Sequence, residues 1–174
     1  LRFLRVNRAA EKLIGLPREK LIGRNDHDFF PVEQADYFTS MDRKTLTSRE
    51  TVVIPQEEID TADRGRRLLH TKKVPVLDDS GQARYLLGLS EDITERVAAE
   101  QALLESERRF RAIFNSTFQF IGILSPDGIL LEANRTALEF IGKTSRDVVG
   151  KYFWDTDWWN DTPEGRSRLR EAVH

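Results

Sequence analysis

The alternation of apolar and polar residues changes in character along the first half of the chain. Residues 3–7 have the pattern of a strand end, and residues 32–47 space their apolar side chains on one helical face. From 51 to 93 three β-rich runs follow, separated by polar turn sequences at 60–65 and 78–81. Such turns join antiparallel neighbours, so this stretch predicts a three-stranded meander.

Two prolines lie inside these β-rich runs. Pro55 and Pro75 cannot donate a hydrogen bond to a neighbouring strand, and proline in sheets is confined to edges, strand starts and bulges. Each proline therefore predicts an edge, a bulge or a missing ladder bond at its position.

The second half of the chain begins with helical character. Residues 94–116 contain neither glycine nor proline, and Asp92 or Thr94 can cap the start of a helix. A long helix is therefore predicted over 94–116. Residues 118–134 then have the pattern of a hairpin around a Pro-Asp-Gly turn, and further short helices follow.

Part of the sequence occurs twice. An Asn-Arg pair and two glycines recur at one constant separation, and the apolar residues around them keep step. A repeat of such long period indicates two copies of one domain, each of about 100–130 residues. Because 174 residues cannot hold two such copies in full, we expect a piece of a longer polypeptide whose ends fall inside domains. The recurring residues are Asn7 with Asn134, Gly15 with Gly142, and Gly23 with Gly150.

Composition excludes several kinds of chemistry. With 39% hydrophobic and 32% charged residues the chain is typical of a globular protein, and its longest apolar runs fall far short of the ~20 residues that cross a bilayer. A net charge of −2 provides no overall attraction to nucleic acid or to an anionic membrane. The absence of cysteine excludes disulfides, thiolate metal sites and cysteinyl cofactors, and it fits a cytoplasmic location.

On these residues the chain resembles a tandem of PAS sensor domains, as found in bacterial-type signalling proteins such as sensor histidine kinases and diguanylate cyclases. The resemblance rests on RFLRVNRAAEKLIG, on ILSPDGILLEANRTALEFIG and on KKVPVLDDSGQARYLLGLSEDITER. The triplet Asp92-Ile93-Thr94, where the last strand passes into a helix, is the most specific motif. The resemblance implies an α+β fold in which a five-stranded antiparallel sheet carries short helices on one face.

The resemblance also implies how the chain is divided. Residues 1–93 are expected to form a PAS domain that lacks its first strand, 94–116 a connecting signalling helix, and 117–174 the N-terminal part of a second PAS domain. In this family the first strand lies at the centre of the sheet, and its absence would leave backbone groups unpaired. We therefore expect 118–134 of the same or a neighbouring chain, or residues upstream of Leu1, to take its place. Exchange of a strand between two copies would give a homodimer.

A small-ligand pocket is expected between the helix at 32–47 and the sheet. Alternation leaves open which face of the second β-rich run points inward, because its more apolar residues are the even-numbered ones from Leu68 to Val76. The resemblance instead favours Leu69, Thr71 and Lys73. The expected pocket residues are Tyr37, Phe38 and Met41 from the helix, with Thr71, Lys73 and Ser90 from the strands.

Lys73 would have a specific consequence if it points inward. A buried ammonium group requires an anionic partner. That partner would be either a small carboxylate ligand or an Asp or Glu of the domain. In a third alternative, the Lys73 side chain reaches solvent.

Asp92 and Thr94 lie where the last strand passes into the long helix. Their side chains can cap the helix and tie it to the sheet, so that a shift of the sheet is transmitted to the helix. The plainer alternative is a helix cap with no part in signalling.

The residues give little support to a bound cofactor, whose identity stays unknown. The helix at 32–47, which would supply an axial ligand to haem, has no histidine, and His27 between two aspartates is a poor metal site. Without cysteine a cysteinyl flavin cannot form. A non-covalent flavin could stack on the tryptophans of 152–161, but these can equally pack a loop over the sheet.

No catalytic function is indicated. The glycines are isolated rather than grouped in a phosphate-binding loop, and no Gly-x-Ser-x-Gly motif occurs. The phospho-acceptor histidine motif of kinases and the Gly-Gly-acidic signature of cyclases are not seen either. The chain is therefore expected to be a sensory and dimerising module that binds a small ligand or a partner. The alternative is an interaction scaffold without a ligand.

Overall fold

The computed structural model describes residues 1–159 and 163–173. The chain divides into two compact units, Leu1–Glu100 and Gln101–His174. Residues 160–162 and 174 lie outside the described part. No helix among the described residues is both long enough and apolar enough to cross a membrane.

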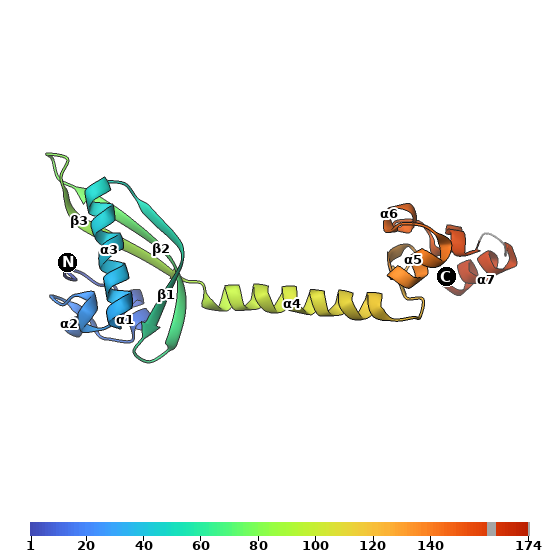
Figure 1. Cartoon of the computed structure of the whole chain (residues 1–174), viewed down its shortest axis with the longest axis horizontal. Coiled ribbons are helices and arrows are strands. Elements are labelled where there is room, and N and C mark those ends of the chain that lie inside the picture. The colour runs from blue at the N-terminus through green and yellow to red at the C-terminus, as the bar shows by residue number, and fades with distance from the viewer. Residues whose placement is uncertain (160–162, 174) are drawn as a thin grey trace. The chain divides into compact units, whose positions relative to one another are not determined.

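The first unit is built on a three-stranded antiparallel sheet of order β1-β2-β3. Helix α3 lies across this sheet and contacts all three strands (Figure 1). The predicted meander and the predicted helix before it are both confirmed. The elements are α1 (Arg8–Ile14), α2 (Arg18–Leu21), η1 (Asp26–Asp28), α3 (Val32–Ser48), β1 (Val52–Thr61), β2 (Gly65–Leu77) and β3 (Ala83–Asp92).

Aromatic and aliphatic side chains fill the space between the helices and the sheet. Phe30 and Phe38 meet edge to face, with their ring centroids 5.4 Å apart, an arrangement that aromatic pairs favour. Residues from both the helices and the strands contribute, so the first unit has a core of its own. The buried cluster consists of Ile14, Leu21, Phe30, Ala35, Phe38, Ile59 and Leu69.

The predicted strand at 3–7 is wrong, because the structure has no strand there. Phe3 is nevertheless held in place: its N–H donates to the Arg24 carbonyl at 2.9 Å, and its carbonyl accepts from the Gly23 N–H at 2.8 Å. A strand requires a continuous ladder with a neighbouring backbone. No described segment provides one for residues 3–7, so an extended stretch does not become a strand.

The first unit's sheet has three strands among the described residues, where the resemblance implies five. Strand β3 pairs with β2 on one side, and no described strand pairs with its other edge. Strand β4 (Gly122–Leu124) pairs with β5 (Leu130–Ala133) and with no other described strand.

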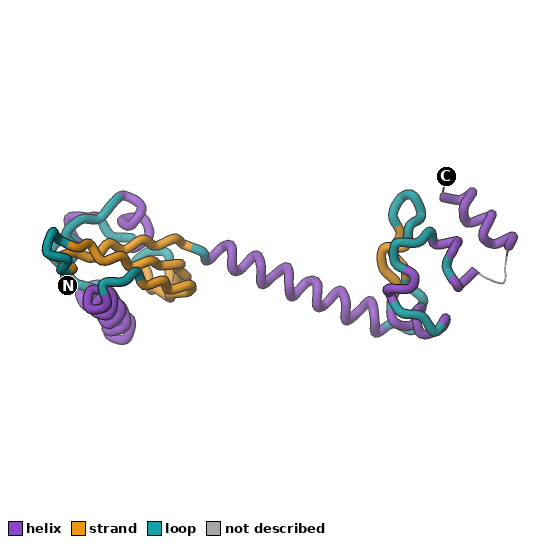
Figure 2. The backbone as a smooth tube through the Cα atoms, turned by 90° about the horizontal axis from the view of Figure 1, so that it is seen from above, coloured by secondary structure: helices purple, strands orange, loops and turns teal. Residues whose placement is uncertain are grey.

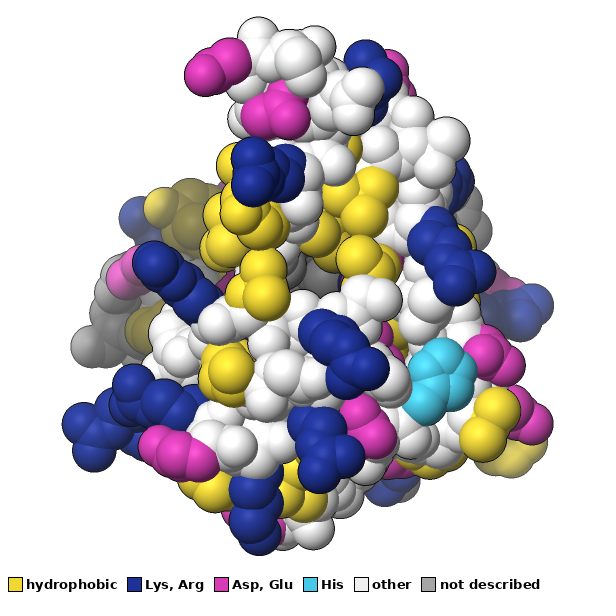
Figure 3. Space-filling view, turned by 90° about the vertical axis from the view of Figure 1, so that its left-hand side faces the viewer, with side chains coloured by type: hydrophobic (Ala, Val, Ile, Leu, Met, Phe, Trp, Pro, Cys, Tyr) yellow, Lys and Arg dark blue, Asp and Glu magenta, His cyan; other side chains and the backbone are white. Residues whose placement is uncertain are grey.

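The face of this sheet turned away from α3 carries a row of exposed apolar side chains on β3. The hydroxyls of Thr71 and Ser90 meet on the α3 side, 3.0 Å apart. Because side chains alternate along a strand, Tyr85, Leu87 and Leu89 point to the opposite face. These three side chains are 46%, 48% and 51% exposed. The view in Figure 3 shows hydrophobic side chains gathered around a hollow on one side of the molecule.

Helix α4 (Thr94–Ser116) coincides with the predicted long helix and appears as one unbroken rod in the backbone view (Figure 2). The hairpin of β4 and β5 follows, shorter than the predicted 118–134. The remaining elements of the second unit are α5 (Arg135–Ile141), α6 (Ser145–Val148), η2 (Phe153–Asp155), η3 (Asp157–Trp159) and α7 (Pro163–Val173).

The Asn134 side chain holds the segment that precedes the hairpin. It is fully buried and accepts a hydrogen bond from the Ile121 N–H at 3.1 Å. The same side chain donates to the carbonyls of Gln119 at 2.8 Å and Phe114 at 3.0 Å. One side-chain amide thus satisfies three backbone groups that precede β4.

The two repeated asparagines have the same local role. Asn7 accepts a hydrogen bond from the Ala10 N–H at 2.9 Å and caps α1. Asn134 accepts from the Ala137 N–H at 3.1 Å and caps α5. An asparagine in this position satisfies a backbone donor that has no partner within the helix. The repeated sequence therefore corresponds to a repeated local structure.

The repeated glycines end the same helices. Gly15 and Gly142 follow α1 and α5 with φ of 81° and 62°, in the left-handed region that glycine adopts without strain. The backbone pairing of the segment before each first helix is repeated as well. It joins Phe3 to Gly23 and Arg24 in the first unit, and Leu130 to Gly150 and Lys151 in the second.

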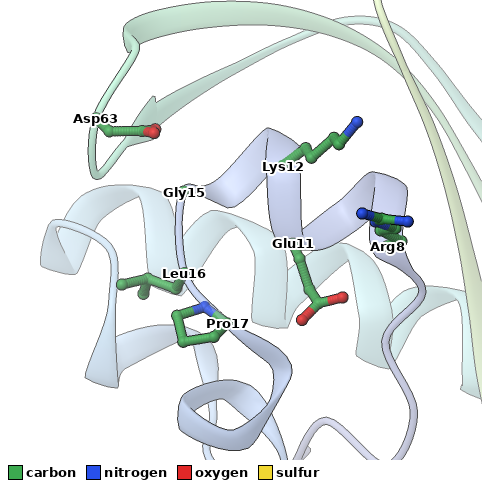
Figure 4. A pocket seen from close by; sticks show the side chains of 7 residues that line it. All are labelled: Arg8, Glu11, Lys12, Gly15, Leu16, Pro17 and Asp63. Carbon is green, nitrogen blue, oxygen red and sulfur yellow. The ribbon is translucent and has the colours of Figure 1, made fainter.

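Helix α1 ends against the turn between β1 and β2. The Ala62 N–H donates to the Ile14 carbonyl at 3.0 Å, and Asp63 lies on that turn beside Gly15 (Figure 4). A Cβ atom at Gly15 would overlap the Asp63 carboxylate. The end of α1 therefore requires glycine at position 15, for the space beside Asp63 as well as for its φ.

Gly15→Ala is expected to destabilise the chain more than Gly23→Ala. The two glycines have φ of 81° and 79°, so each substitution places a side chain in the left-handed region at a cost of about 1–2 kcal/mol. A Cβ at Gly23 meets nothing within 4 Å, whereas at Gly15 it must displace Asp63. Urea unfolding should show an additional loss of about 1 kcal/mol for Gly15→Ala. Equal losses would mean that Asp63 does not constrain this helix end.

Candidate functional site

A buried ion pair joins helix α3 to the central strand of the first sheet. The Nζ of Lys73 on β2 lies 2.5 Å from Oδ1 of Asp42 on α3, and the two side chains are only 10% and 12% exposed. The ammonium group also lies 6.0 Å from the centroid of the Phe38 ring, within the range of a cation–π contact.

This pair answers the question of what neutralises Lys73. Of the three alternatives, the structure shows pairing with an aspartate of the domain itself. Asp42 supplies the negative charge that a carboxylate ligand would have supplied in the first alternative. A carboxylate that bound Lys73 would have to displace Asp42, which would leave a buried aspartate without its partner.

A second aspartate lies close to the pair. Burial raises the pKa of Asp26, and the negative charge of Asp42 raises it further, while the positive charge of Lys73 acts in the opposite direction. Two carboxylates thus compete for one ammonium group, and Asp26 holds its proton more tightly than an exposed aspartate.

The six residues expected to line a ligand pocket lie in different surroundings. Phe38, Thr71 and Lys73 are buried, and Met41 is half-buried. These four residues lie where α3 covers β2, and their role in ligand binding stays a prediction. The exposed members are Tyr37 and Ser90.

Sequence reasoning missed two buried acids, Asp42 and Glu57. Asp42 follows Phe38 by one helical turn, so a charge on the apolar face of a predicted helix was a signal of its burial. Glu57 carried no such signal. Its side-chain direction depends on an irregularity of β1 that alternation alone cannot locate.

The irregularity predicted at Pro55 is confirmed as a change of register. Ile54 pairs with Thr71, but the next pair joins Glu57 to Leu69, so two residues of β1 oppose one of β2. Such a bulge reverses the alternation beyond it. Glu57 consequently points to the buried side.

Thr94 ties the start of helix α4 to the sheet. Its Oγ1 accepts a hydrogen bond from the Leu68 N–H at 2.9 Å and donates to Oδ1 of Asp92 at 2.6 Å. The neighbouring Ile93 N–H donates to the Leu68 carbonyl at 2.8 Å. Both backbone groups of Leu68 on β2 are thus bonded to Ile93 and Thr94, where the long helix begins.

Asp92 is ionised in this arrangement. Its partial burial alone would raise the pKa, but hydrogen bonds from Thr94 and the positive charges of Arg67 and Arg64 outweigh that effect, so the pKa is lowered. The carboxylate accepts from the Thr94 N–H at 3.1 Å as well as from its hydroxyl.

The residues considered for cofactor binding make other contacts. The Nε2 of His27 lies 2.8 Å from the Asp36 carboxylate, and no group of three or more possible ligands among the described residues could hold a metal ion. Trp154 is buried, and the Trp158 Nε1–H donates to the Ala137 carbonyl at 3.1 Å.

Two family models match the chain. One, described as PAS fold, covers residues 1–98, and the other, described as PAS domain, covers residues 119–174. Because the first alone matches more than half of the residues, the chain belongs to the PAS family. PAS domains are sensor modules rather than catalysts, and this chain is accordingly a sensor segment of the signal-transduction class.

Similar proteins include sensor histidine kinases. The sensor histidine kinase TmoS of Ectopseudomonas mendocina is 36% identical over 84 residues, which cover 47% of this chain and 8% of the kinase. The aerobic respiration control sensor protein ArcB of Escherichia coli K12 is 31% identical over 142 residues, 78% of this chain and 18% of ArcB. This chain thus spans less than a fifth of either kinase.

Among solved structures, the Vibrio cholerae VqmA dimer is similar to part of the chain. The sequence identity is 26%, the TM-score is 0.48, and the match covers 54% of this chain and 42% of VqmA.

Lys73→Met is expected to destabilise the chain by about 3–5 kcal/mol, because it leaves the Asp42 carboxylate buried without its partner. The double variant Lys73→Met with Asp42→Leu should recover most of this loss, since no buried charge remains. Urea unfolding of both single variants and the double variant forms a thermodynamic cycle that isolates the interaction.

The exposed neighbour Lys72 provides the control. Lys72→Met should change the free energy of unfolding by no more than about 0.5 kcal/mol. A Lys73→Met variant as stable as the Lys72→Met control would show that the buried pair does not hold α3 to β2.

Proposed function

We propose that the chain is the sensory and dimerising segment of a larger cytoplasmic signalling protein. In this proposal residues 1–93 form a PAS domain, 94–116 the signalling helix and 117–174 the first part of a second PAS domain. A small ligand or a protein partner changes the packing of α3 on the sheet, and α4 transmits the change. The proposed pocket residues are Tyr37, Phe38, Met41, Thr71, Lys73 and Ser90, and the proposed transmitting residues are Asp92 and Thr94.

The contact between Leu68 and Thr94 carries this proposal. Strand β2 bears Lys73, which is bonded to α3, and a few residues away it bears Leu68, which is bonded to the start of α4. One rigid strand therefore connects the helix that covers the pocket with the helix that leaves the domain. A stimulus that favours one position of α3 biases the position of α4 through β2.

The relatives support a proposal for the output of the parent protein. TmoS is a sensor histidine kinase and ArcB an aerobic respiration control sensor protein, and the described residues of this chain belong to sensor modules. The proposed parent therefore carries a kinase or cyclase domain in another part of the polypeptide, and this segment regulates it.

A scaffold without a ligand is the second candidate, and one observation favours it. Lys73 is neutralised by Asp42, so the interior beneath Phe38 is complete without a bound anion. In that case α3 and the sheet form a fixed platform, and partner binding occurs on the outer face of the sheet.

Dimerisation is supported by exposed apolar surface in two places. Tyr85, Leu87 and Leu89 form a row on the outer face of the first sheet, and contiguous apolar surface of this kind marks interaction sites. Helix α4 also exposes large apolar side chains. These are Leu103, Leu104, Phe110 and Ile113. A second copy of the chain that packs on both surfaces would bury them, and exchange of the segment 118–134 between copies is the other arrangement.

Thr94→Val is expected to uncouple α4 from the sheet, because valine retains the shape of threonine but neither accepts from Leu68 nor donates to Asp92. Lys73→Met perturbs the attachment of α3 to β2 and should accelerate hydrogen exchange in the first turns of α4. In the Thr94→Val background this effect of Lys73→Met should disappear. Hydrogen exchange with mass spectrometry measures it directly.

Thr94→Ser keeps the hydroxyl and is the matched control, in which the response to Lys73→Met should persist. A response of equal size in the valine variant would contradict transmission through this junction. If Lys73→Met does not change hydrogen exchange in α4 in any of these backgrounds, the function supported is the scaffold without a ligand.

The proposed dimer predicts that Leu87→Glu weakens self-association at least tenfold. A charge placed in a buried apolar interface must be desolvated without a partner. Val32→Glu alters a more exposed apolar side chain on α3, 68% against 48% for Leu87, and should leave association unchanged. Sedimentation equilibrium measures both dissociation constants. If Leu87→Glu has no effect while Phe120→Pro abolishes the dimer, strand exchange is the correct arrangement.

A further inference from the structure

An open acidic cavity lies between helix α3 and strand β1, and Tyr37 is the one predicted pocket residue among those that line it. It has a volume of about 400 Å³, which is in the range of small-molecule sites. Its walls carry three carboxylates and one guanidinium group, so an excess of negative charge faces the space. The residues that matter here are Glu33 and Tyr37 from α3, and Glu57, Glu58 and Arg66 from the sheet.

Glu57 is the central residue of this cavity. It is only 6% exposed, and its Oε1 atom is buried without a hydrogen-bond partner among the described residues. An unpaired buried carboxylate oxygen is costly, because it has lost its water without gaining another donor. Such an atom calls for an explanation, and a ligand that supplies the missing donor is one.

The bulge at Pro55 is what brings Glu57 to this position. With regular alternation from the buried Ile54, Gln56 would face inward and Glu57 would face solvent. The register shift between Ile54 and Glu57 places the carboxylate on the buried side instead. Bulges frequently re-aim a side chain next to a functional site.

The positive group of the cavity does not neutralise Glu57. The Arg66 guanidinium is bonded to Glu58 at 3.1 Å and to Asp60 at 3.1 Å. The side-chain amide of Gln34 is also engaged, since it donates to Asp60 at 3.0 Å. Glu57 is thus left as an acceptor, because Arg66 and Gln34 are bonded to other acids and no hydrogen bond joins it to Gln56 or Tyr37.

The chemistry of the walls selects an organic cation. A metal ion needs several ligands around one point, and no group of three or more possible ligands among the described residues meets that requirement. A protonated amine needs one acceptor for its N–H and a negative or aromatic surface for the rest of its charge. Glu57 supplies the acceptor, and the 41% exposed ring of Tyr37 with the Glu33 carboxylate supplies the surface.

We propose that this cavity binds a small alkylammonium compound, with its N–H donated to the carboxylate of Glu57. The inference rests on the proposed sensory function and names the ligand class of the sensor. The ligand would contact α3 and β1 together and leave the Lys73–Asp42 pair intact, so binding would shift the helix on the sheet without exposing a buried charge.

The test is titration of the 174-residue chain with 1,4-diaminobutane and n-butylamine at neutral pH, where both are protonated. The matched neutral and anionic probes are n-butanol and butyrate. Calorimetry should give saturable binding for the two amines, and binding at least tenfold weaker, or none, for n-butanol and butyrate. Amines that do not bind, or that bind no better than n-butanol, would overturn the proposal.

Glu57→Gln keeps the size of the side chain and removes its charge, so amine affinity should fall at least tenfold. Glu50→Gln, an exposed site outside the cavity, should bind as the original chain does. If Glu57→Gln does not fold, Tyr37→Leu with Glu33→Gln tests the cavity from α3 and should weaken binding at least threefold. Affinity that is unchanged in these cavity variants would refute the assignment.

Hydrogen exchange in α4 separates this inference from the proposed function. Amine binding that requires Glu57 but leaves α4 unchanged would support the site and contradict transmission. Binding of n-butanol or butyrate that changes exchange in α4, with no amine binding, would support transmission and contradict this ligand class.

Discussion

The buried pair of Lys73 and Asp42 is the interaction on which the first unit depends. A charge taken from water costs several kcal/mol unless a well-placed partner compensates it. Here the compensation comes from another element, since the ammonium belongs to the central strand and the carboxylate to the covering helix. The position of α3 on the sheet is therefore set by charge as well as by apolar packing. Any displacement that separated the two groups would leave a buried ion without its partner.

This constraint also makes ligand binding at Lys73 less favourable than ligand binding at Glu57. A carboxylate ligand at Lys73 has to compete with Asp42, which is already in place and lies next to Asp26. A cation at Glu57 displaces no protein partner of Oε1, because that atom has none among the described residues. A ligand gains most where the protein has an unmet requirement. As a ligand site, the structure thus favours the cavity between α3 and β1 over the predicted pocket at Lys73.

Local elements were predictable because their signals lie in adjacent residues. The absence of glycine and proline marks α4, Pro55 marks a bulge, and Asn7 and Gly15 mark the two ends of α1. The strand at 3–7 was wrong for a reason that is not local. An extended stretch becomes a strand only beside a second backbone, and no described segment forms a ladder with it. Its equivalent around Leu130 has β4 as a neighbour and is a strand.

The candidate site shows the same division between local and distant information. The apolar face of α3 predicted the burial of Phe38, and the resemblance to PAS domains placed Thr71 and Lys73 inward. Asp42 could have been found as a charge on that face. Glu57 could not, because one inserted residue reverses the direction of every later side chain in the strand. Pro55 indicates an irregularity, but it does not determine whether the next buried residue is Gln56 or Glu57.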